Sequence, residues 1–158
     1  MTEELASVPV STSYVEMSEI VMPNDTNPLG NLMGGRLMHL ADIAAAIAAG
    51  RVARGPVVTA GVDRVNFRSP VRVGGILVIK AAVNYTHRTS MECGVSMWAE
   101  DRASGRRYKI ASAYLTFVSL DENTGRPRPV PKVEPESDEE KRRHREAEER
   151  RRRRLKLN

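Results

Sequence analysis

One segment of the chain is apolar on nearly every side, and it limits the possible folds more than any other feature. Residues 37–49 read LMHLADIAAAIAA. Apolar residues recur at helical spacing and fill the remaining faces as well: Leu37, Leu40, Ala41, Ala44, Ile47 and Ala48, then Met38, Ile43, Ala45, Ala46 and Ala49. A helix of this kind is a buried helix. Arg51 and Arg54 suit the negative end of its dipole, and Gly55 with Pro56 ends it.

The rest of the chain up to about residue 120 is typical of β-strands. A period of two in β-branched and apolar residues predicts five of them: residues 12–21, 57–67, 76–87, 92–101 and 107–120. Residues 22–35 are dense in Asn, Asp, Pro and Gly, which predicts a structured loop before the helix. Short connections predict that the last three strands are antiparallel neighbours. We therefore expect a meander of about four strands after the helix.

A single sheet wrapped around one central helix is the α+β arrangement known as the hotdog fold, and 158 residues suit one such domain. The arrangement leaves an open sheet edge and apolar surface, so we expect a dimer with a continuous sheet. Residues 121–135 hold four prolines and are expected to end the fold as a linker. We accordingly assign residues 1–131 to the domain and residues 132–158 to a linker with a charged tail.

The tail carries most of the chain's charge. Residues 136–158 hold ten Lys or Arg against seven Asp or Glu, so they supply +3 of the net +5. Ser137 and Glu140 match a capping box, which predicts a helix start, and several acid-before-base pairs follow at a spacing of four. A solvated helix, free or packed on a neighbouring subunit, is favoured over a surface for nucleic acid or membrane. No nucleic-acid partner is expected.

The remaining bulk features favour a soluble cytoplasmic protein without a metal. Cys93 is the only cysteine, which excludes an intrachain disulfide. His39, His87 and His144 are scattered and lack metal-ligand spacing. The first residues resemble no signal peptide, and no apolar run is long enough to cross a bilayer.

Asp42 is the most informative residue, because it interrupts the apolar helix. A carboxylate in such surroundings costs several kcal/mol unless it is hydrogen-bonded or paired. Two interpretations are open: a core aspartate satisfied by a nearby donor, or a general base or nucleophile made reactive by partial desolvation.

The loop before the helix adds three further candidates. Asn27 lies among Pro and Gly residues, where an asparagine is commonly a turn former. Gly34 and Gly35 precede the helix, and free N–H groups there are able to hold a developing oxyanion, although a plain loop-to-helix turn also explains them. A phosphate loop is excluded because no Lys-Ser or Lys-Thr follows the glycines.

Three stretches in this order resemble the acyl-CoA hydrolases of the hotdog superfamily. They are DTNPLGNLMGGRLMHLAD, VVTAGVDRVNFRSPVRVGG and HRTSMECGVSMWAED, and the resemblance covers about residues 10–131. The most similar group contains bacterial short-chain acyl-CoA thioesterases and vertebrate cytosolic and brain acyl-CoA hydrolases. The resemblance implies hydrolysis of fatty acyl-CoA to free acid and coenzyme A.

The same resemblance implies roles for particular residues. The family motif falls on Asn27, Gly30, Gly34 and Gly35, and its helix carboxylate falls on Asp42. In such enzymes the Asn-bearing loop of one subunit faces the carboxylate of the other. Asp42 would activate water or attack the thioester directly, Asn27 would orient the water or the carbonyl, and the helix amides would stabilise the oxyanion. No cofactor is implied beyond the coenzyme A of the substrate. Homodimers, and hexamers built as trimers of dimers, are implied.

The resemblance also suggests residues that contact the substrate. Thr59 matches a strand motif and would line the acyl pocket or support Asp42, while an ordinary strand threonine is an equal alternative. Arg88, Thr89 and Ser90 match the family's segment near bound coenzyme A, and a turn between strands explains them about as well. Arg64 and Arg68 are further candidates for the nucleotide phosphates.

Two other function classes compete with hydrolysis. A non-catalytic acyl-CoA sensor would not need both Asn27 and Asp42. A hotdog dehydratase would need a His–Asp or His–Glu pair, and His39 with Asp42 on one helix has the wrong spacing. His39 itself is interpreted either as a partner of Asp42 or, preferably, as a satisfied core histidine.

Overall fold

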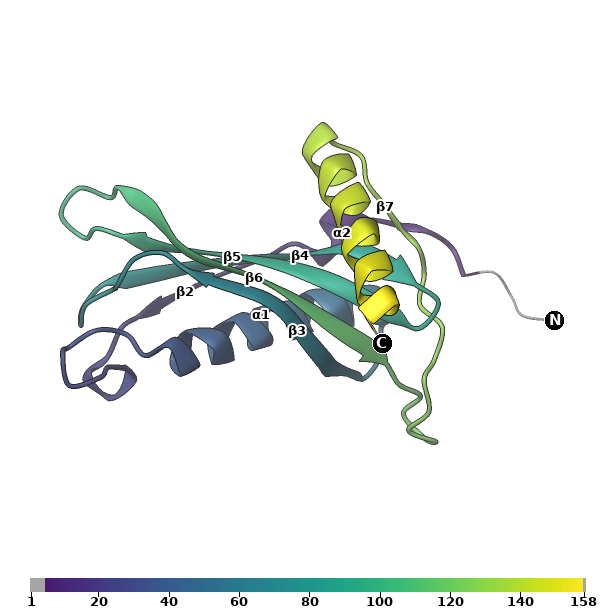
Figure 1. Ribbon diagram of the computed structural model, residues 1–158, viewed down its shortest axis with the longest axis horizontal. Helices are drawn as coiled ribbons and strands as arrows, with labels where there is room; N and C mark the ends of the chain where they lie inside the picture. Colours follow the sequence, from purple (N-terminus) through teal and green to yellow (C-terminus); the bar gives the residue numbers. More distant parts are fainter. Residues whose placement is uncertain (1–4, 158) are drawn as a thin grey trace.

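The computed structural model describes residues 5–157. A five-stranded antiparallel sheet with the order β2-β4-β5-β6-β3 has the long helix α1 on one face and the helix α2 on the other (Figure 1). The main elements are β2 (Val15–Ile20), α1 (Gly34–Ala53), β3 (Val57–Phe67), β4 (Ile76–His87), β5 (Ser90–Glu100), β6 (Arg107–Ser119) and α2 (Asp138–Leu157). The expected α+β hotdog arrangement is confirmed, and no helix within residues 5–157 is long and apolar enough to span a membrane.

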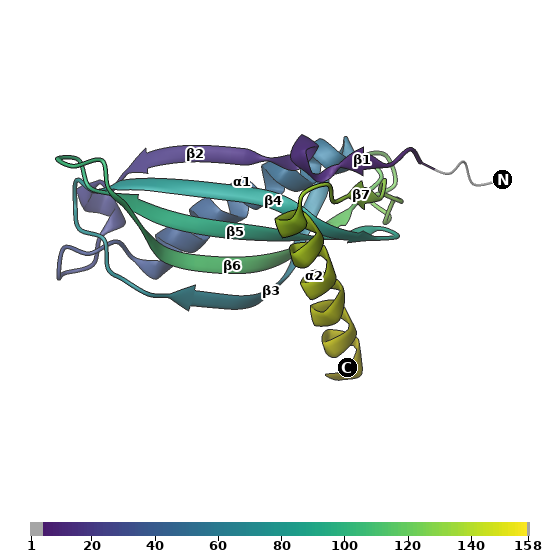
Figure 2. The ribbon, with the colours of Figure 1, turned by 90° about the horizontal axis from the view of Figure 1, so that it is seen from above.

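The order of the strands corrects one expectation. β4, β5 and β6 form the expected antiparallel meander, but β3 pairs with β6 at the far edge instead of with β4 (Figure 2). The loop between β3 and β4 carries the chain back across the sheet and is held there by hydrogen bonds, with Leu32 N donating to Val71 O at 2.7 Å and Val21 N donating to Gly75 O at 2.9 Å. A four-strand meander was therefore wrong, because α1 crosses beneath the sheet before β3 begins.

Helix α1 packs one face against the sheet, and that face consists largely of alanine. Ala41, Ala44, Ala45, Ala48 and Ala49 are each 0% exposed, so the helix axis lies close to the strands. The larger core side chains of the concave sheet face lie opposite: Leu77, Ile79, Met91, Met97, Leu115 and Phe117.

The outer face of α1 is open in the single chain, which corrects the expectation of burial all round. Ile43 and Ile47 are 37% and 41% exposed. His39 is also exposed, so its interpretation as a core histidine was wrong for the protomer. One sheet covers only one side of a helix, and the other side stays exposed unless a second layer packs against it.

The proline-rich segment after β6 is tied to the sheet rather than free. β7 (Val133–Glu134) pairs in parallel with β1 (Val8–Pro9). Farther upstream, Val130 N donates to Arg88 O at 2.8 Å and Arg128 N donates to Ser119 O at 2.8 Å. These bonds fix residues 128–134 as a strap over the end of the sheet.

Helix α2 begins as the capping box predicts. The amide of Glu140 donates to Ser137 Oγ at 3.1 Å, and the amide of Ser137 donates to Glu140 Oε1 at 3.1 Å. The hydroxyl of Tyr14 donates to the other oxygen of Glu140. This hydrogen bond raises the pKa of Tyr14 to about 12 and lowers the pKa of Glu140.

One side of α2 is anchored on the convex face of the sheet. Arg150 donates from Nε and Nη2 to the two carboxylate oxygens of Glu92 at 2.8 and 2.9 Å, and Glu92 is only 3% exposed. The guanidinium also lies 3.7 Å from the ring centroid of Tyr114. Burial opposes the charge of Arg150, but the hydrogen bonds that Arg150 donates to Glu92 and the negative charge of Glu92 together outweigh it and raise the pKa of Arg150. A wholly solvated helix was therefore wrong.

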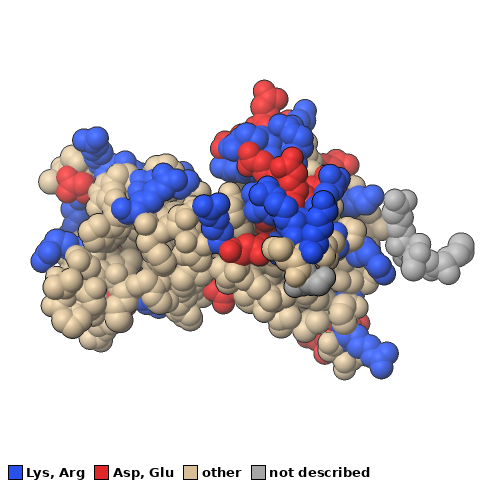
Figure 3. Space-filling model, viewed as in Figure 1, with Lys and Arg blue, Asp and Glu red and all other residues tan. Residues whose placement is uncertain are grey.

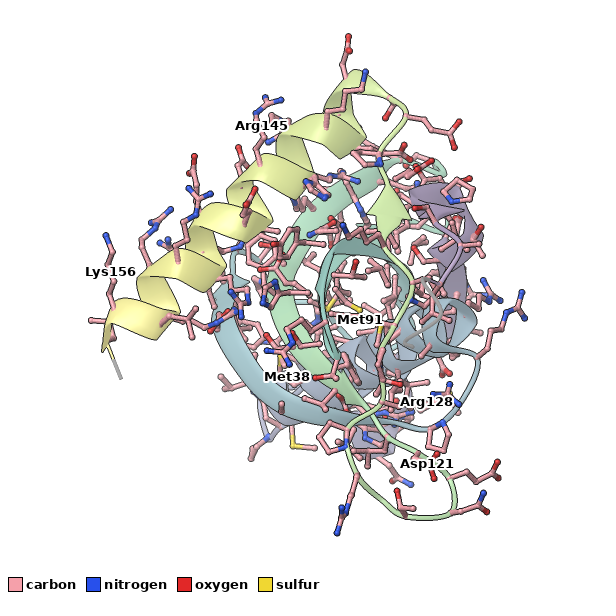
Figure 4. The ribbon with its side chains drawn as sticks, turned by 90° about the vertical axis from the view of Figure 1, so that its right-hand side faces the viewer. Met38, Met91, Asp121, Arg128, Arg145 and Lys156 are labelled. Atoms are coloured by element: carbon pink, nitrogen blue, oxygen red, sulfur yellow. The ribbon has the colours of Figure 1, made fainter. Side chains whose placement is uncertain are left out.

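The outer side of α2 matches the charge pattern of the tail. Lys, Arg, Asp and Glu are interleaved over it (Figure 3), and Arg145 and Lys156 point away from the sheet (Figure 4). Exposed ion pairs at a spacing of four join Glu139 to Arg143 at 2.8 Å and Glu148 to Arg152 at 3.1 Å. Such pairs contribute only about 0.3–0.5 kcal/mol each.

Candidate active site

Asp42 is held by a residue of the neighbouring strand. It lies half-buried on α1, and Thr59 of β3 donates its hydroxyl to Asp42 Oδ1 at 2.6 Å. No hydrogen bond joins Asp42 to His39 in the described part of the chain. One carboxylate oxygen is thus fixed by a neutral donor while the other remains available. Of the two roles suggested for Thr59, the geometry supports the positioning of Asp42.

The loop with Asn27 is a tight turn closed by its own side chain. Asn27 Oδ1 accepts from the amides of Leu29 and Asn31 at 3.0 and 3.1 Å, and Gly30 adopts a φ of +79° to complete the turn. Asn27 is therefore the turn former that its surroundings predicted. Its side-chain NH2 group donates to no acceptor among residues 5–157, so it is the part of Asn27 able to meet a ligand.

Gly34 and Gly35 form the first turn of α1. Amides in a first turn lack intrahelical acceptors, and none of the other described residues accepts from these two. Both glycines are exposed, and a side chain at Gly35 would meet nothing within 4 Å. These N–H groups lie at the positive end of the helix dipole.

The asparagine loop and the carboxylate lie apart within one chain. Asp42 is eight residues beyond Gly34 on a straight helix, which puts their backbones roughly 12 Å apart. One chain therefore presents two separate half-sites: the amides with Asn27 at the start of α1, and Asp42 with Thr59 near its middle.

Both half-sites adjoin a surface with the character of an interface. The outer edge of β3 pairs with no other strand among residues 5–157. Large apolar side chains are exposed along it and on the adjacent face of α1: Val58, Val62, Phe67, Ile43 and Ile47. A long open edge beside exposed apolar groups favours pairing with a second chain.

A cavity of about 450 Å³ opens beside the start of α1. Arg68, one of the predicted phosphate ligands, lies on its wall beside Phe67 and Gly34. Arg64 lies farther back along β3, exposed, opposite Tyr114 of β6. Neither arginine lies near Arg88 in the single chain, because β3 runs away from that end of the sheet.

A second cavity of about 1020 Å³ lies at the other end of α1, and Arg88 is on its wall. Arg88 occupies the β4–β5 turn with a φ of +53°, next to Thr89 and Ser90. Three further cations line this cavity: Arg54, Arg128 and Lys132. None of these three residues was predicted from the sequence to line a site, although residues 126–132 are rich in basic residues and prolines.

Two histidines line the same cavity, His87 from β4 and His144 from α2. Burial lowers the pKa of His87, and the charges of Arg151 and Arg88 lower it further. Burial also lowers the pKa of His144, whose ring meets that of Tyr85 edge-on at 5.0 Å. Both are therefore disposed to be neutral near neutral pH. No group of three His, Cys, Asp or Glu residues within 5–157 is arranged to hold a metal ion.

Comparison with known proteins identifies the family. Residues 29–105 match the model of the thioesterase superfamily. An uncharacterized acyl-CoA thioester hydrolase of Haemophilus influenzae is 37% identical over 77% of this chain and 80% of its own. The acyl-CoA thioester hydrolase YciA of Salmonella typhimurium is 38% identical over 71% and 86%. The mouse cytosolic acyl coenzyme A thioester hydrolase is 38% identical over 78% of this chain, which spans 32% of that longer protein.

Solved structures of similar proteins support the same family. An apo-hexameric acyl-CoA thioesterase superimposes with a TM-score of 0.92 at 39% identity, covering 97% of each chain. An acyl-CoA hydrolase of Staphylococcus aureus, solved with butyryl coenzyme A and coenzyme A, gives 0.88 at 39% identity over 94% of this chain and 90% of its own. That hydrolase was also solved as Asn→Ala, Asp→Ala and Thr→Ala variants, and the three positions are spaced as Asn27, Asp42 and Thr59 are here.

The chain belongs to the acyl-CoA thioester hydrolases of the thioesterase superfamily.

Proposed function

We propose that the protein hydrolyses the thioester of a fatty acyl-CoA to the free acid and coenzyme A, with Asp42 as the essential carboxylate. The observation that carries this proposal is the hydrogen bond of 2.6 Å from Thr59 to Asp42. It fixes the carboxylate on an otherwise apolar helix face and leaves one oxygen free toward the open surface of α1 and β3. The equal spacing of the three replaced residues in the Staphylococcus aureus hydrolase supports the same assignment.

The reaction needs a base or nucleophile, an oxyanion site and a leaving thiolate. As a base, Asp42 removes a proton from water as the water oxygen bonds to the thioester carbon. The C–S bond then breaks, and the proton passes to the departing sulfur of coenzyme A. As a nucleophile, Asp42 bonds to the thioester carbon, the C–S bond breaks and coenzyme A leaves as a thiolate that takes up a proton. Water then hydrolyses the resulting mixed anhydride to the free acid and Asp42. In both routes the amides of Gly34 and Gly35 receive the carbonyl oxygen, and the NH2 group of Asn27 orients the carbonyl or the water.

A dimer joins the two half-sites. Antiparallel pairing of two β3 edges about a two-fold axis makes one continuous sheet. It brings the start of α1 in one chain toward the middle of α1 in its partner, so that Asn27 and Gly34 work opposite the partner's Asp42. The same pairing carries Arg64 and Arg68 toward the partner's Arg88. Assembly into hexamers is part of the proposal and is supported by the hexameric state of the solved relative with a TM-score of 0.92. Within the hexamer we propose three such dimers.

The cationic cavity is suited to the nucleotide of coenzyme A. Arg54, Arg88, Arg128 and Lys132 supply four positive charges, and Glu148 is the one acidic residue that residues 5–157 contribute to the wall. Cations with N–H donors match phosphate oxygens. Thr89 and Ser90, in the turn beside Arg88, are assigned to the same part of the substrate.

The remaining assignments follow from the residues involved. Every residue assigned to the chemical step precedes residue 131, so residues 1–131 are proposed as the catalytic domain. Residues 132–158 are proposed as an appended segment, of which Lys132 lines the nucleotide cavity. The chemistry uses side chains and amides, so no metal or further cofactor is proposed. A cytoplasmic location is proposed from the single cysteine and the cytosolic mammalian relatives.

The test is release of free thiol from acetyl-, butyryl- and palmitoyl-CoA. We expect activity in the wild type and a large loss in Asp42→Ala and Asn27→Ala. Asp63→Ala is the matched control, because Asp63 is a carboxylate of β3 that faces Arg154 of α2 instead. Thiol release from none of the three substrates, with coenzyme A still bound, would favour the acyl-CoA sensor. Full activity in both variants would refute the assigned residues.

A second measurement separates the two routes of Asp42. In a single turnover in ¹⁸O-water, the base route places the label in the fatty acid and never in Asp42. Label in the Asp42 carboxylate, found by peptide mass spectrometry, requires a mixed anhydride that water attacks at the Asp42 carbon, so it identifies the nucleophilic route.

A further inference from the structure

Phe67 is exposed where a large aromatic side chain would ordinarily be buried. It is the last residue of β3 and is 57% exposed. Its ring lies against the first turn of α1, because a methyl group placed on Gly34 would come within 3.3 Å of Phe67 Cζ. The ring therefore stands beside Gly34, the first of the two glycines with free amides.

The cavity of about 450 Å³ begins under this ring. Its wall is mostly apolar: Leu32, Leu37, Phe67, Pro70, Val71 and Ile110. Arg68 and Ser69 supply its polar side. If the amides of Gly34 and Gly35 hold the carbonyl oxygen of the thioester, the acyl chain attached to that carbonyl lies next to this apolar cavity. The cavity therefore suits the hydrocarbon of the acyl chain.

We propose that Phe67 determines which acyl chains the enzyme accepts, by forming part of the wall of the apolar cavity beside the start of α1. This inference rests on the proposed hydrolysis of acyl-CoA. With the carbonyl oxygen on the amides of Gly34 and Gly35, the acyl chain enters the cavity and runs toward the Phe67 ring. The ring then sets the length of chain that is buried before the chain meets a wall.

The size of the Phe67 side chain predicts the direction in which a smaller residue would change the preference for acyl-chain length. Each methylene buried in an apolar site contributes about 0.8 kcal/mol, which is about fourfold in kcat/KM. Methylenes that meet the Phe67 ring gain nothing or clash. Removing the ring lengthens the hollow, so longer chains gain several such steps while short chains gain none.

The experiment compares kcat/KM for butyryl-, octanoyl- and dodecanoyl-CoA in the wild type, Phe67→Leu and Phe67→Ala. We expect the ratio of dodecanoyl to butyryl activity to rise by about tenfold or more in Phe67→Ala, with Phe67→Leu in between. Val62→Ala is the matched control, because Val62 is a 44% exposed apolar residue of the same strand that does not line the cavity. Its chain-length profile should stay that of the wild type.

Three outcomes would overturn the proposal. One is an unchanged profile in Phe67→Ala. Another is an equal loss for every chain length together with dissociation on size-exclusion chromatography, which would make Phe67 a dimer contact only. The third is the same shift in Val62→Ala. A wild type that hydrolyses none of the substrates would refute the proposed function itself and is distinguishable from all three.

Discussion

Replacing Arg150 by methionine tests how α2 is held on the sheet. Arg150→Met keeps an unbranched apolar stem but removes the guanidinium and both of its hydrogen bonds to Glu92. Glu92 is 3% exposed beneath the helix, and among residues 5–157 only the side-chain amide of Asn84 would still donate to it, at 3.3 Å. An unpaired carboxylate in this position must be desolvated, must be protonated, or must force α2 away from the sheet.

The expected loss is large for a single substitution. Breaking a buried ion pair from one side costs about 3–5 kcal/mol. The side chain of Arg150 is still 19% exposed, which admits some water and places the cost at the lower end, near 3 kcal/mol. At about 2–4 °C per kcal/mol for a chain of this size, the melting temperature should fall by roughly 6–12 °C.

Urea unfolding followed by circular dichroism measures this loss. Arg152→Met is the matched control, since Arg152 is 68% exposed and its pair with Glu148 should contribute no more than about 0.5 kcal/mol. The double variant Glu92→Gln with Arg150→Met removes the stranded charge and should recover most of the lost stability. A loss below about 1 kcal/mol in Arg150→Met, or no recovery in the double variant, would refute the anchoring of α2 by this pair.

Three further outcomes follow from the contacts. Burial lowers the pKa of His144 below its ordinary 6.5, so the stability that neutral His144 contributes is complete above pH 6.5 and is lost as the pH falls toward the pKa of His144 in the folded protein. In urea unfolding, the loss of stability between pH 8 and pH 5 should be smaller in His144→Phe than in the wild type. An equal loss would contradict burial of His144 as the cause. Thr59→Val should lower kcat by about ten- to a hundredfold with little change in KM, whereas Thr59→Ser should stay close to the wild type; steady-state kinetics that show only a raised KM would reject positioning of Asp42. Burial raises the pKa of the Cys93 thiol, so an aromatic disulfide reagent should react with it only at the rate of unfolding, and fast labelling of the native protein would be inconsistent with this burial.

Local pattern accounts for most of the secondary structure that the sequence predicted. Residues 57–67 and 76–87 were predicted as strands, and the structure has strands with these bounds. The apolar helix was predicted from about residue 36, and α1 begins at Gly34. The period of a strand or helix depends on neighbours a few residues apart, so one sequence is enough to find it.

Local sequence periods could not predict which elements distant in the sequence pair with one another. The position of β3 beside β6 depends on a chain crossing over α1, which no local period records. β1 and β7 have two residues each and lie at opposite ends of the chain. The anchor of α2 joins Arg150, one of many arginines in a charged tail, to Glu92 in a strand. Nothing near either residue in the sequence distinguishes this pair from the solvated ones.

The candidate site also contains residues that local sequence could reveal and residues that only the fold brings together. Asp42 was recognisable because a carboxylate contradicts its apolar surroundings. Its partner Thr59 is seventeen residues away on another element, and only the packing of β3 against α1 brings the two together. Arg54, Arg128 and Lys132 meet in one cavity for the same reason, so they were overlooked.

The separation of the half-sites leads to a quantitative prediction about mixed dimers. In a dimer of Asp42→Ala with Asn27→Ala, one site combines both substitutions and the other combines the intact Asn27 with the intact Asp42. Each mixed dimer therefore has one working site of two, and random mixing makes half of all dimers mixed. Co-expression of two inactive variants should then restore about a quarter of the wild-type activity. If Asn27 and Asp42 instead served one site within the same chain, every site in the mixture would carry one substitution. No activity would return, although the roughly 12 Å of helix between the two half-sites already argues against that arrangement.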